Sequence, residues 1–144
     1  MTIVPMQQEH IDTIAALERT CFSEPWSAAA LAEELTNPHA VFRVAVEGES
    51  LLGYVGMHHL VDEGFITNVA VFPHARRRGV AAALLADLTA YGKANGLYRI
   101  TLEVRVGNLP ARSLYEREGY VLDGVRPNFY RAPAEDAAIY SLYF

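Results

Sequence analysis

Three consecutive arginines followed by small and apolar residues, RRRGVAAALL at 76 to 85, lie between two segments of different periodicity. The apolar run that ends at Pro73 is typical of a strand, and residues 79 to 95 have the spacing of a long helix. The first N–H groups of a helix have no partner inside it and offer donors to an anion, and Gly79 and Ala81 leave room for a close ligand. This layout favours a phosphate site, although a solvated basic turn explains the stretch equally well. Neither a Walker motif nor G-x-G-x-x-G is present.

Two side chains are candidates for proton transfer. Glu103 is at the centre of the apolar stretch ITLEV, where a carboxylate is either desolvated or tied to an ordered water, and both suit a general base. Because residues 101, 103 and 105 share one face of a strand, an outward-facing position is the alternative. Tyr115 carries a phenol that is protonated at neutral pH and can donate its proton, unless it is a core tyrosine beside Leu114 and Ala111.

Composition limits what the arginines can bind. The 144 residues are 51% hydrophobic and 20% charged, which is typical of a soluble globular protein, and we expect a single domain over residues 1–144. The formal net charge of -5 argues against general affinity for a polyanion, so the basic cluster is a local exception.

The remaining compositional signals concern cysteine and location. The single cysteine, Cys21, excludes an internal disulfide and is expected to be a buried apolar residue rather than a nucleophile or zinc ligand. The first residues, MTIVPMQQEHID, lack the features of a signal peptide, and no apolar run is long enough to span a bilayer. We therefore expect a cytoplasmic protein without metal.

The patterns around these residues predict alternating helices and strands in a mixed α/β sheet. A short strand at 2 to 5 is followed by a helix from Glu9 to Phe22, and Ser27 is a suitable N-cap for a second helix at 28 to 36. Three strands of a meander are expected between 40 and 72, and LYRITLEV is a further strand. Asn108 is expected to cap a helix at 109 to 118, before the last strands YVLDG and AAIYSLYF.

The arginine stretch also resembles a known signature. Arg76-x-x-Gly79-x-Ala81, after NVAVFP, is similar to the Q/R-x-x-G-x-G/A motif of the GCN5-related N-acetyltransferases (GNAT), whose loop holds the pyrophosphate of acetyl-coenzyme A. The order of elements agrees over about residues 3 to 143. The resemblance implies a GNAT fold, with a mixed sheet of about seven strands splayed between strands four and five and about four helices. It also implies acetyl-CoA as co-substrate.

Five stretches resemble one branch of that family, the bacterial enzymes that acetylate the N-terminal alanine of ribosomal proteins: EPWS, TNVAVFP, TLEVRVGN, ARSLYEREGY and RPNFY. Ala81, Gly107 and Pro110 depart from the usual residues of the branch. The implied partner is the N-terminus of a ribosomal protein, and the enzyme is expected to be a monomer or weak homodimer without nucleic-acid or membrane partners. The alternatives are acetylation of a small-molecule amine or of lysine side chains and, in another class, an RNA- or ribosome-binding module.

The resemblance assigns a role to each site residue. Glu103 is the general base and Tyr115, in NLPARSLY, the general acid. The acceptor is expected near Trp26 and Tyr130. The cofactor is expected to bind to the backbone and side chains of Val69, Ala70, Val71, Arg77, Arg78, Gly79, Val80, Ala81, Ala82 and Asn108. Arg76 opens the signature, but its amide precedes the loop, so it is not included.

Overall fold

The computed structural model describes residues 1–144 and confirms a mixed α/β fold. Seven strands form one sheet in the order β1-β2-β3-β4-β5-β7-β6. The strands are β1 (Thr2–Pro5), β2 (Ala40–Glu47), β3 (Ser50–Leu60), β4 (Glu63–Val71), β5 (Arg99–Arg105), β6 (Val121–Arg131) and β7 (Ala134–Tyr143). The α-helices are α1 (Ile11–Cys21), α2 (Ala28–Glu34), α3 (Val80–Ala94) and α4 (Leu109–Arg117), with short 3-10 turns η1 (Gln8–His10) and η2 (Pro73–Ala75).

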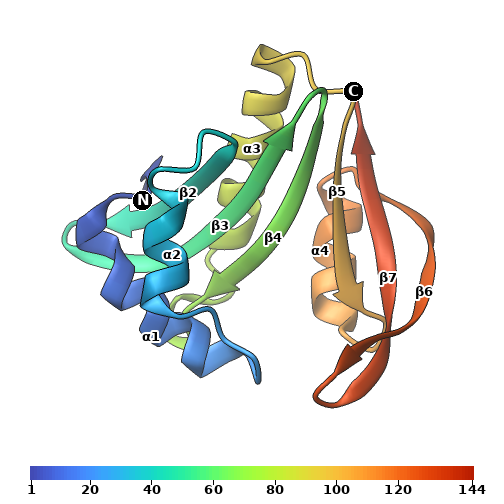
Figure 1. Ribbon diagram of the computed structural model, residues 1–144, viewed down its shortest axis with the longest axis horizontal. Coiled ribbons are helices and arrows are strands. Elements are labelled where there is room, and N and C mark those ends of the chain that lie inside the picture. The colour runs from blue at the N-terminus through green and yellow to red at the C-terminus, as the bar shows by residue number, and fades with distance from the viewer.

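Helices cover both faces of the sheet (Figure 1). On one face, α1 and α2 pack over β2 to β4 around a core that includes Ile14, Leu17 and Leu31. On the other face, α3 and α4 pack around a second core that includes Leu84, Leu88 and Tyr115. No helix in the chain is both long and apolar enough to cross a membrane.

The sheet opens between β4 and β5, as expected. The two strands are parallel and pair only at Glu63–Phe65 with Arg99–Thr101. Beyond these residues they diverge, and Figure 1 shows the gap widening toward the end of β4. The peptide groups of the later part of β4 that face β5 therefore have no strand partner, although the other edge of β4 stays paired with β3.

Most predicted elements are present, with differences at their ends. The first helix begins with a 3-10 turn and ends at Cys21, and the second ends at Glu34, two residues earlier than expected. Ser27 and Asn108 act as the predicted N-caps, accepting from the amides of Ala30 and Ala111 at 3.1 and 3.3 Å.

Strand β6 is longer than the predicted strand YVLDG and includes RPNFY. Pro127 has no N–H to donate to a partner strand, so a prediction from sequence stops before it. The structure accommodates it in an irregular stretch between Arg126 and Tyr130, after which pairing with β7 resumes at Tyr130 and Glu135. Tyr130 is therefore part of a strand.

Candidate active site

A cleft of about 1120 Å³ lies where β4 and β5 separate. Its walls come from these two strands, the turn before α3, the start of α4, the α1–α2 connection and the β6–β7 hairpin. All but one of the predicted site residues line it: Trp26, Val69, Ala70, Val71, Arg77, Gly79, Val80, Ala81, Ala82, Glu103, Asn108, Tyr115 and Tyr130. Segments far apart in the sequence thus meet in one space.

The exception among the predicted residues is Arg78. Its guanidinium makes an ion pair with Glu47 on β2 at 2.8 Å, and the residue does not line the cleft. The preceding Arg76 points back along the turn, where its Nε donates to the carbonyl of Val71 at 3.2 Å. Arg77 lines the cleft and, unlike Arg76 and Arg78, makes no side-chain hydrogen bond within the chain. Its guanidinium is therefore available to a ligand.

The turn presents backbone amides rather than side chains to the cleft. Arg77 and Gly79 have left-handed φ angles of 63° and 75°, and Gly79 is the N-cap of α3 without a side-chain cap. The first amides of α3 therefore have no capping side chain and lie at the positive end of the helix dipole. This geometry suits the pyrophosphate of a nucleotide.

We expect Gly79→Ala to weaken acetyl-CoA binding by about tenfold, because alanine disfavours the left-handed conformation that aims the amides. The free energy of unfolding should fall by about 1 kcal/mol. Calorimetric titration with acetyl-CoA and denaturant unfolding measure the two effects. Gly96→Ala is a matched control, because Gly96 also has a positive φ (69°) and open space around it, yet lies at the far end of α3. An equal loss of affinity in both variants would contradict the assignment.

Glu103 lies on the polar face of β5. The apolar neighbours that surround it in sequence, Leu102 and Val104, point into the core, whereas Glu103 is a third exposed. Its Oε1 is 3.4 Å from Nη1 of Arg126 on β6. Of the settings considered for Glu103, this exposure excludes full desolvation and agrees with the outward-facing position that strand alternation gives residues 101, 103 and 105. There the carboxylate lines the cleft and is accessible to water.

Tyr115 lies on α4. Its ring packs in the core beneath α3 and α4, and the residue also lines the cleft. It is 7% exposed, and its ring packs against those of Tyr120 and Tyr140. Burial, with a smaller contribution from the neighbouring Tyr130, raises the pKa of Tyr115 to about 12. Burial and the charge of Glu103 also raise the pKa of Tyr130. The phenol of Tyr115 is thus a protonated group near Tyr130, which in turn lies within electrostatic reach of the Glu103 carboxylate.

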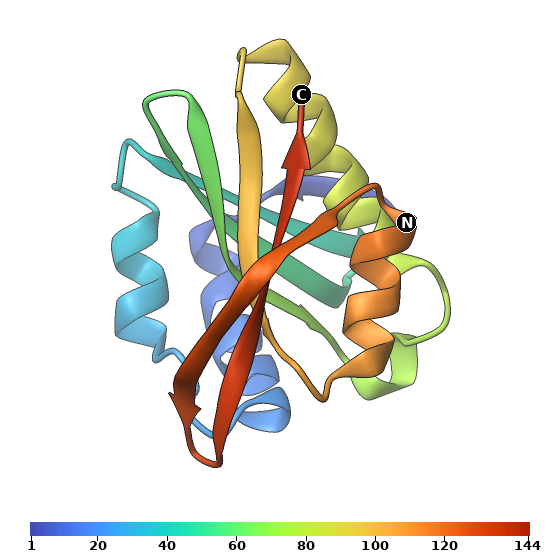
Figure 2. The ribbon, with the colours of Figure 1, turned by 90° about the vertical axis from the view of Figure 1, so that its right-hand side faces the viewer.

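The α1–α2 connection contacts the β6–β7 hairpin beside the cleft. We call the contacts of Ser23 and Glu24 with this hairpin the clasp. The hydroxyl of Ser23 donates to the carbonyl of Ala132 at 2.6 Å, and Arg131 pairs with Glu24 at 3.0 Å. Figure 2 shows the hairpin reaching toward the end of α1. The clasp joins the two segments that carry Trp26 and Tyr130, the residues expected near the acceptor.

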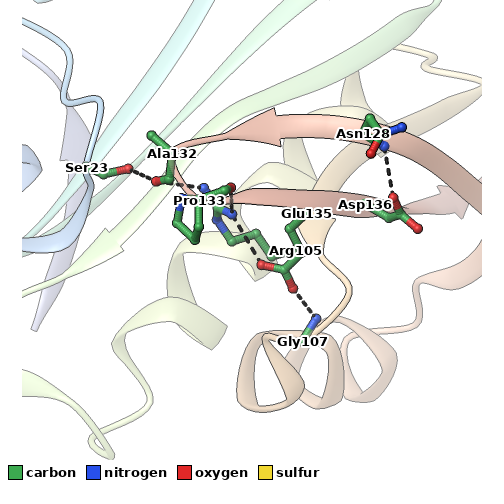
Figure 3. Close-up of polar contacts among 8 residues, drawn as sticks. All are labelled: Ser23, Arg105, Gly107, Asn128, Ala132, Pro133, Glu135 and Asp136. Carbon is green, nitrogen blue, oxygen red and sulfur yellow. Dashed lines mark hydrogen bonds and ion pairs between the residues drawn. The ribbon is translucent and has the colours of Figure 1, made fainter.

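Arg105, on β5, bonds to the β6–β7 hairpin from the side of the cleft. Its guanidinium lies 4.3 Å from the ring centroid of Tyr130 and donates to the carbonyl of Pro133 at 2.8 Å (Figure 3). Glu135 accepts from both Arg105 and the amide of Gly107, at 3.2 and 2.8 Å. These bonds fix Tyr130 over the cleft.

Several residues that line the cleft were not assigned to the site from the sequence. Cys21 is half-buried rather than buried, and its thiol lies 3.5 Å from Nη2 of Arg76. Glu18 and Asn68 are buried polar residues that line the cleft and contact each other. The position of Glu18 carried a signal, because it falls on the same helical stripe as Ile11, Ile14 and Ala15. The chain has no cluster of three or more His, Cys, Asp or Glu side chains placed to hold a metal ion.

Residues 11–120 match the acetyltransferase (GNAT) family. The chain belongs to the GNAT family. It is 32% identical to the N-alpha-acetyltransferase RimI of Mycobacterium tuberculosis, over 95% of this chain and 89% of that protein. It is 28% identical to the [ribosomal protein bS18]-alanine N-acetyltransferase of Escherichia coli K12, over 98% of this chain and 96% of that protein.

A crystal structure of the ribosomal-protein-S18-alanine N-acetyltransferase from Escherichia coli superposes with a TM-score of 0.90. The sequence identity is 26%, and the match covers 99% of this chain and 92% of that chain. As a GNAT enzyme, the protein transfers an acetyl group from acetyl-CoA. The free edge of β4 and the amide-lined turn before α3 fit the extended arm and the pyrophosphate of this co-substrate.

Proposed function

We propose that this GNAT enzyme acetylates the α-amino group of a protein N-terminus, and that its substrate is a small-subunit ribosomal protein that begins with alanine. The relative from Escherichia coli, a [ribosomal protein bS18]-alanine N-acetyltransferase, supports this substrate, and the N-alpha-acetyltransferase of Mycobacterium tuberculosis supports acetylation of an α-amino group. The observation that carries the proposal is that Glu103, Tyr115 and the amide-lined turn of α3 line one cleft.

The acceptor amine must be neutral before it can attack. An α-amino group has a pKa of about 7.7 to 8.0, so roughly a fifth to a third of it is neutral near pH 7.4. A lysine amine, with a pKa of about 10.4, is neutral only to about one part in a thousand. A carboxylate with ordinary access to water, as Glu103 has, is therefore a sufficient base for an N-terminus.

The chain supplies a group for each proton. Glu103, acting through a water molecule, takes the proton that the nitrogen loses as the new C–N bond forms. Tyr115 gives its proton to the sulfur as the C–S bond breaks, so that coenzyme A leaves as a thiol. The products are an amide and a thiol, and Tyr115 recovers a proton from solvent. In the register with β3, the amides of Val69 and Val71 point to the free edge of β4, and we expect them to stabilise the negative charge on the carbonyl oxygen.

The proposal is tested by incubating the enzyme and acetyl-CoA with four peptides and locating the acetyl group by fragmentation mass spectrometry. One peptide has a free N-terminal alanine and an internal lysine, and its matched control has the same sequence with a blocked N-terminus. The other two begin with serine and with a bulky residue. We expect acetylation at the alanine N-terminus and none on the blocked peptide. Acetylation of lysine in both matched peptides would overturn the substrate assignment.

A further inference from the structure

Asn68, on β4, has a buried hydrogen-bond acceptor without a partner. The residue is 8% exposed and lines the cleft. Its Nδ2 donates to Oε2 of Glu18 at 3.2 Å, whereas its Oδ1 has no partner within the chain. The other buried side-chain atom without a partner is the hydroxyl of Tyr120, which does not line the cleft. Buried acceptors are nearly always paired, so Oδ1 is suited to a donor that the cleft receives.

Glu18 fixes which way the Asn68 amide points. Its carboxylate, 1% exposed, accepts from the amide of Trp26 at 2.9 Å and from the hydroxyl of Tyr54 at 2.6 Å. Burial, with the charge of Glu18, raises the pKa of Tyr54, so this phenol stays a donor. An ionised carboxylate can only accept. The amide nitrogen of Asn68 must therefore face Glu18, and Oδ1 is turned away from it.

Strand alternation places this oxygen on the acceptor side of the sheet. Asn68 and Ala70 share the face of β4 that α1 covers, and Ala70 packs into the core of that face. Val69 and Val71 face the opposite core, beneath α3. The N-terminus of α3 follows the amide-lined turn that is expected to bind the pyrophosphate. A group that reaches Oδ1 therefore lies on the side of the α1–α2 connection and Trp26.

We propose that Asn68 is a further acceptor-binding residue, whose Oδ1 accepts a hydrogen bond from the α-amino group that receives the acetyl group. The inference rests on the proposed function. A neutral primary amine has one lone pair and two N–H bonds. With one N–H directed to Asn68 and the other to the base, the lone pair is left for the thioester carbonyl. Asn68 thereby selects primary over secondary amines.

The first test compares Asn68→Leu and the smaller Asn68→Ala with the wild type on the alanine peptide. We expect kcat/KM to fall by about tenfold in each variant, while the Kd of acetyl-CoA stays unchanged. Asn95→Leu is the matched control, since Asn95 is exposed at the end of α3, outside the cleft. Thermal unfolding checks that the variants are folded. A folded variant with wild-type kcat/KM overturns the inference.

The second test changes the substrate. N-methylation of the alanine nitrogen removes one N–H, and an ester in place of the first peptide bond removes the N–H of the second residue. We expect N-methylation to cost the wild type about tenfold more in kcat/KM than it costs the Asn68 variants, and the ester to cost all of them equally. Equal losses on N-methylation, or a difference that appears only with the ester, overturn the inference. A wild type that acetylates no N-terminus overturns the proposed function first, independently of Asn68.

Discussion

Tyr115→Phe is expected to lower kcat by about 100- to 1000-fold with little change in the Kd of acetyl-CoA. The phenol is the buried donor at the cleft wall, and its raised pKa of about 12 keeps it protonated over the whole working range. Phenylalanine preserves the ring and its packing against Tyr120 and Tyr140, so the fold should be retained. Without the hydroxyl, the thiolate must leave unprotonated. Steady-state turnover and calorimetric titration separate the two parameters.

Tyr120→Phe is the matched control. Its ring packs against that of Tyr115, with centroids 5.9 Å apart, but its hydroxyl is buried without a partner and does not line the cleft. Removing an unpaired buried hydroxyl should leave kcat unchanged and leave the free energy of unfolding equal or higher.

For the wild type, kcat should show no alkaline decline below about pH 10, because Tyr115 ionises only above this pH. A decline centred near pH 8, or equal losses in kcat and acetyl-CoA affinity in Tyr115→Phe, would contradict the assignment of Tyr115 as the acid.

The amide-lined turn before α3 and the flanking elements follow from local sequence, because each depends on residues close together in the chain. Gly79 is predicted to begin the helix by the change from strand to helical periodicity, and Ser27 and Asn108 are predicted caps because an N-cap bonds an amide three residues later. The face of Glu103 also follows from alternation along β5, although its apolar neighbours in sequence suggest a desolvated site. Its partner Arg126 lies on a strand two places away in the sheet order, and local patterns do not reveal it.

The clasp and the buried hydrogen bonds of Glu18 cannot be predicted from local sequence patterns, because most of their partners are distant in the chain. Ser23 bonds Ala132 across 109 residues, and two of the three partners of Glu18, Tyr54 and Asn68, lie 36 and 50 residues away along the chain. The helical stripe places Glu18 on the buried face of α1, but only the tertiary fold brings the three donors that compensate for burying its carboxylate. The acceptor side of the cleft is therefore the part that required the structure, whereas the acetyl-CoA side was expected from motifs.

Glu103→Gln is expected to lower kcat/KM for the alanine peptide by about 100-fold near neutral pH, with an unchanged Kd of acetyl-CoA. Glutamine preserves the size of the side chain but cannot take up the proton that the amine loses. The deficit should narrow as the pH rises above about 8, since hydroxide from the solvent can then take the proton that the nitrogen loses as the C–N bond forms. A pH profile of kcat/KM for both enzymes measures this, and it separates loss of a base from a change in packing.

Glu63→Gln provides the control for the loss of a paired carboxylate. Glu63 also lies on a strand and pairs with an arginine, Arg99, but it is outside the cleft, so its variant should keep the wild-type pH profile. Because Arg126 is more than half exposed, its pair with Glu103 contributes little, and Arg126→Gln should change kcat/KM by no more than about threefold. If Glu103→Gln matched the wild type at neutral pH, the proton would have to leave through solvent alone, and Asn68 and Tyr115 would be the remaining polar side chains assigned to the reacting groups.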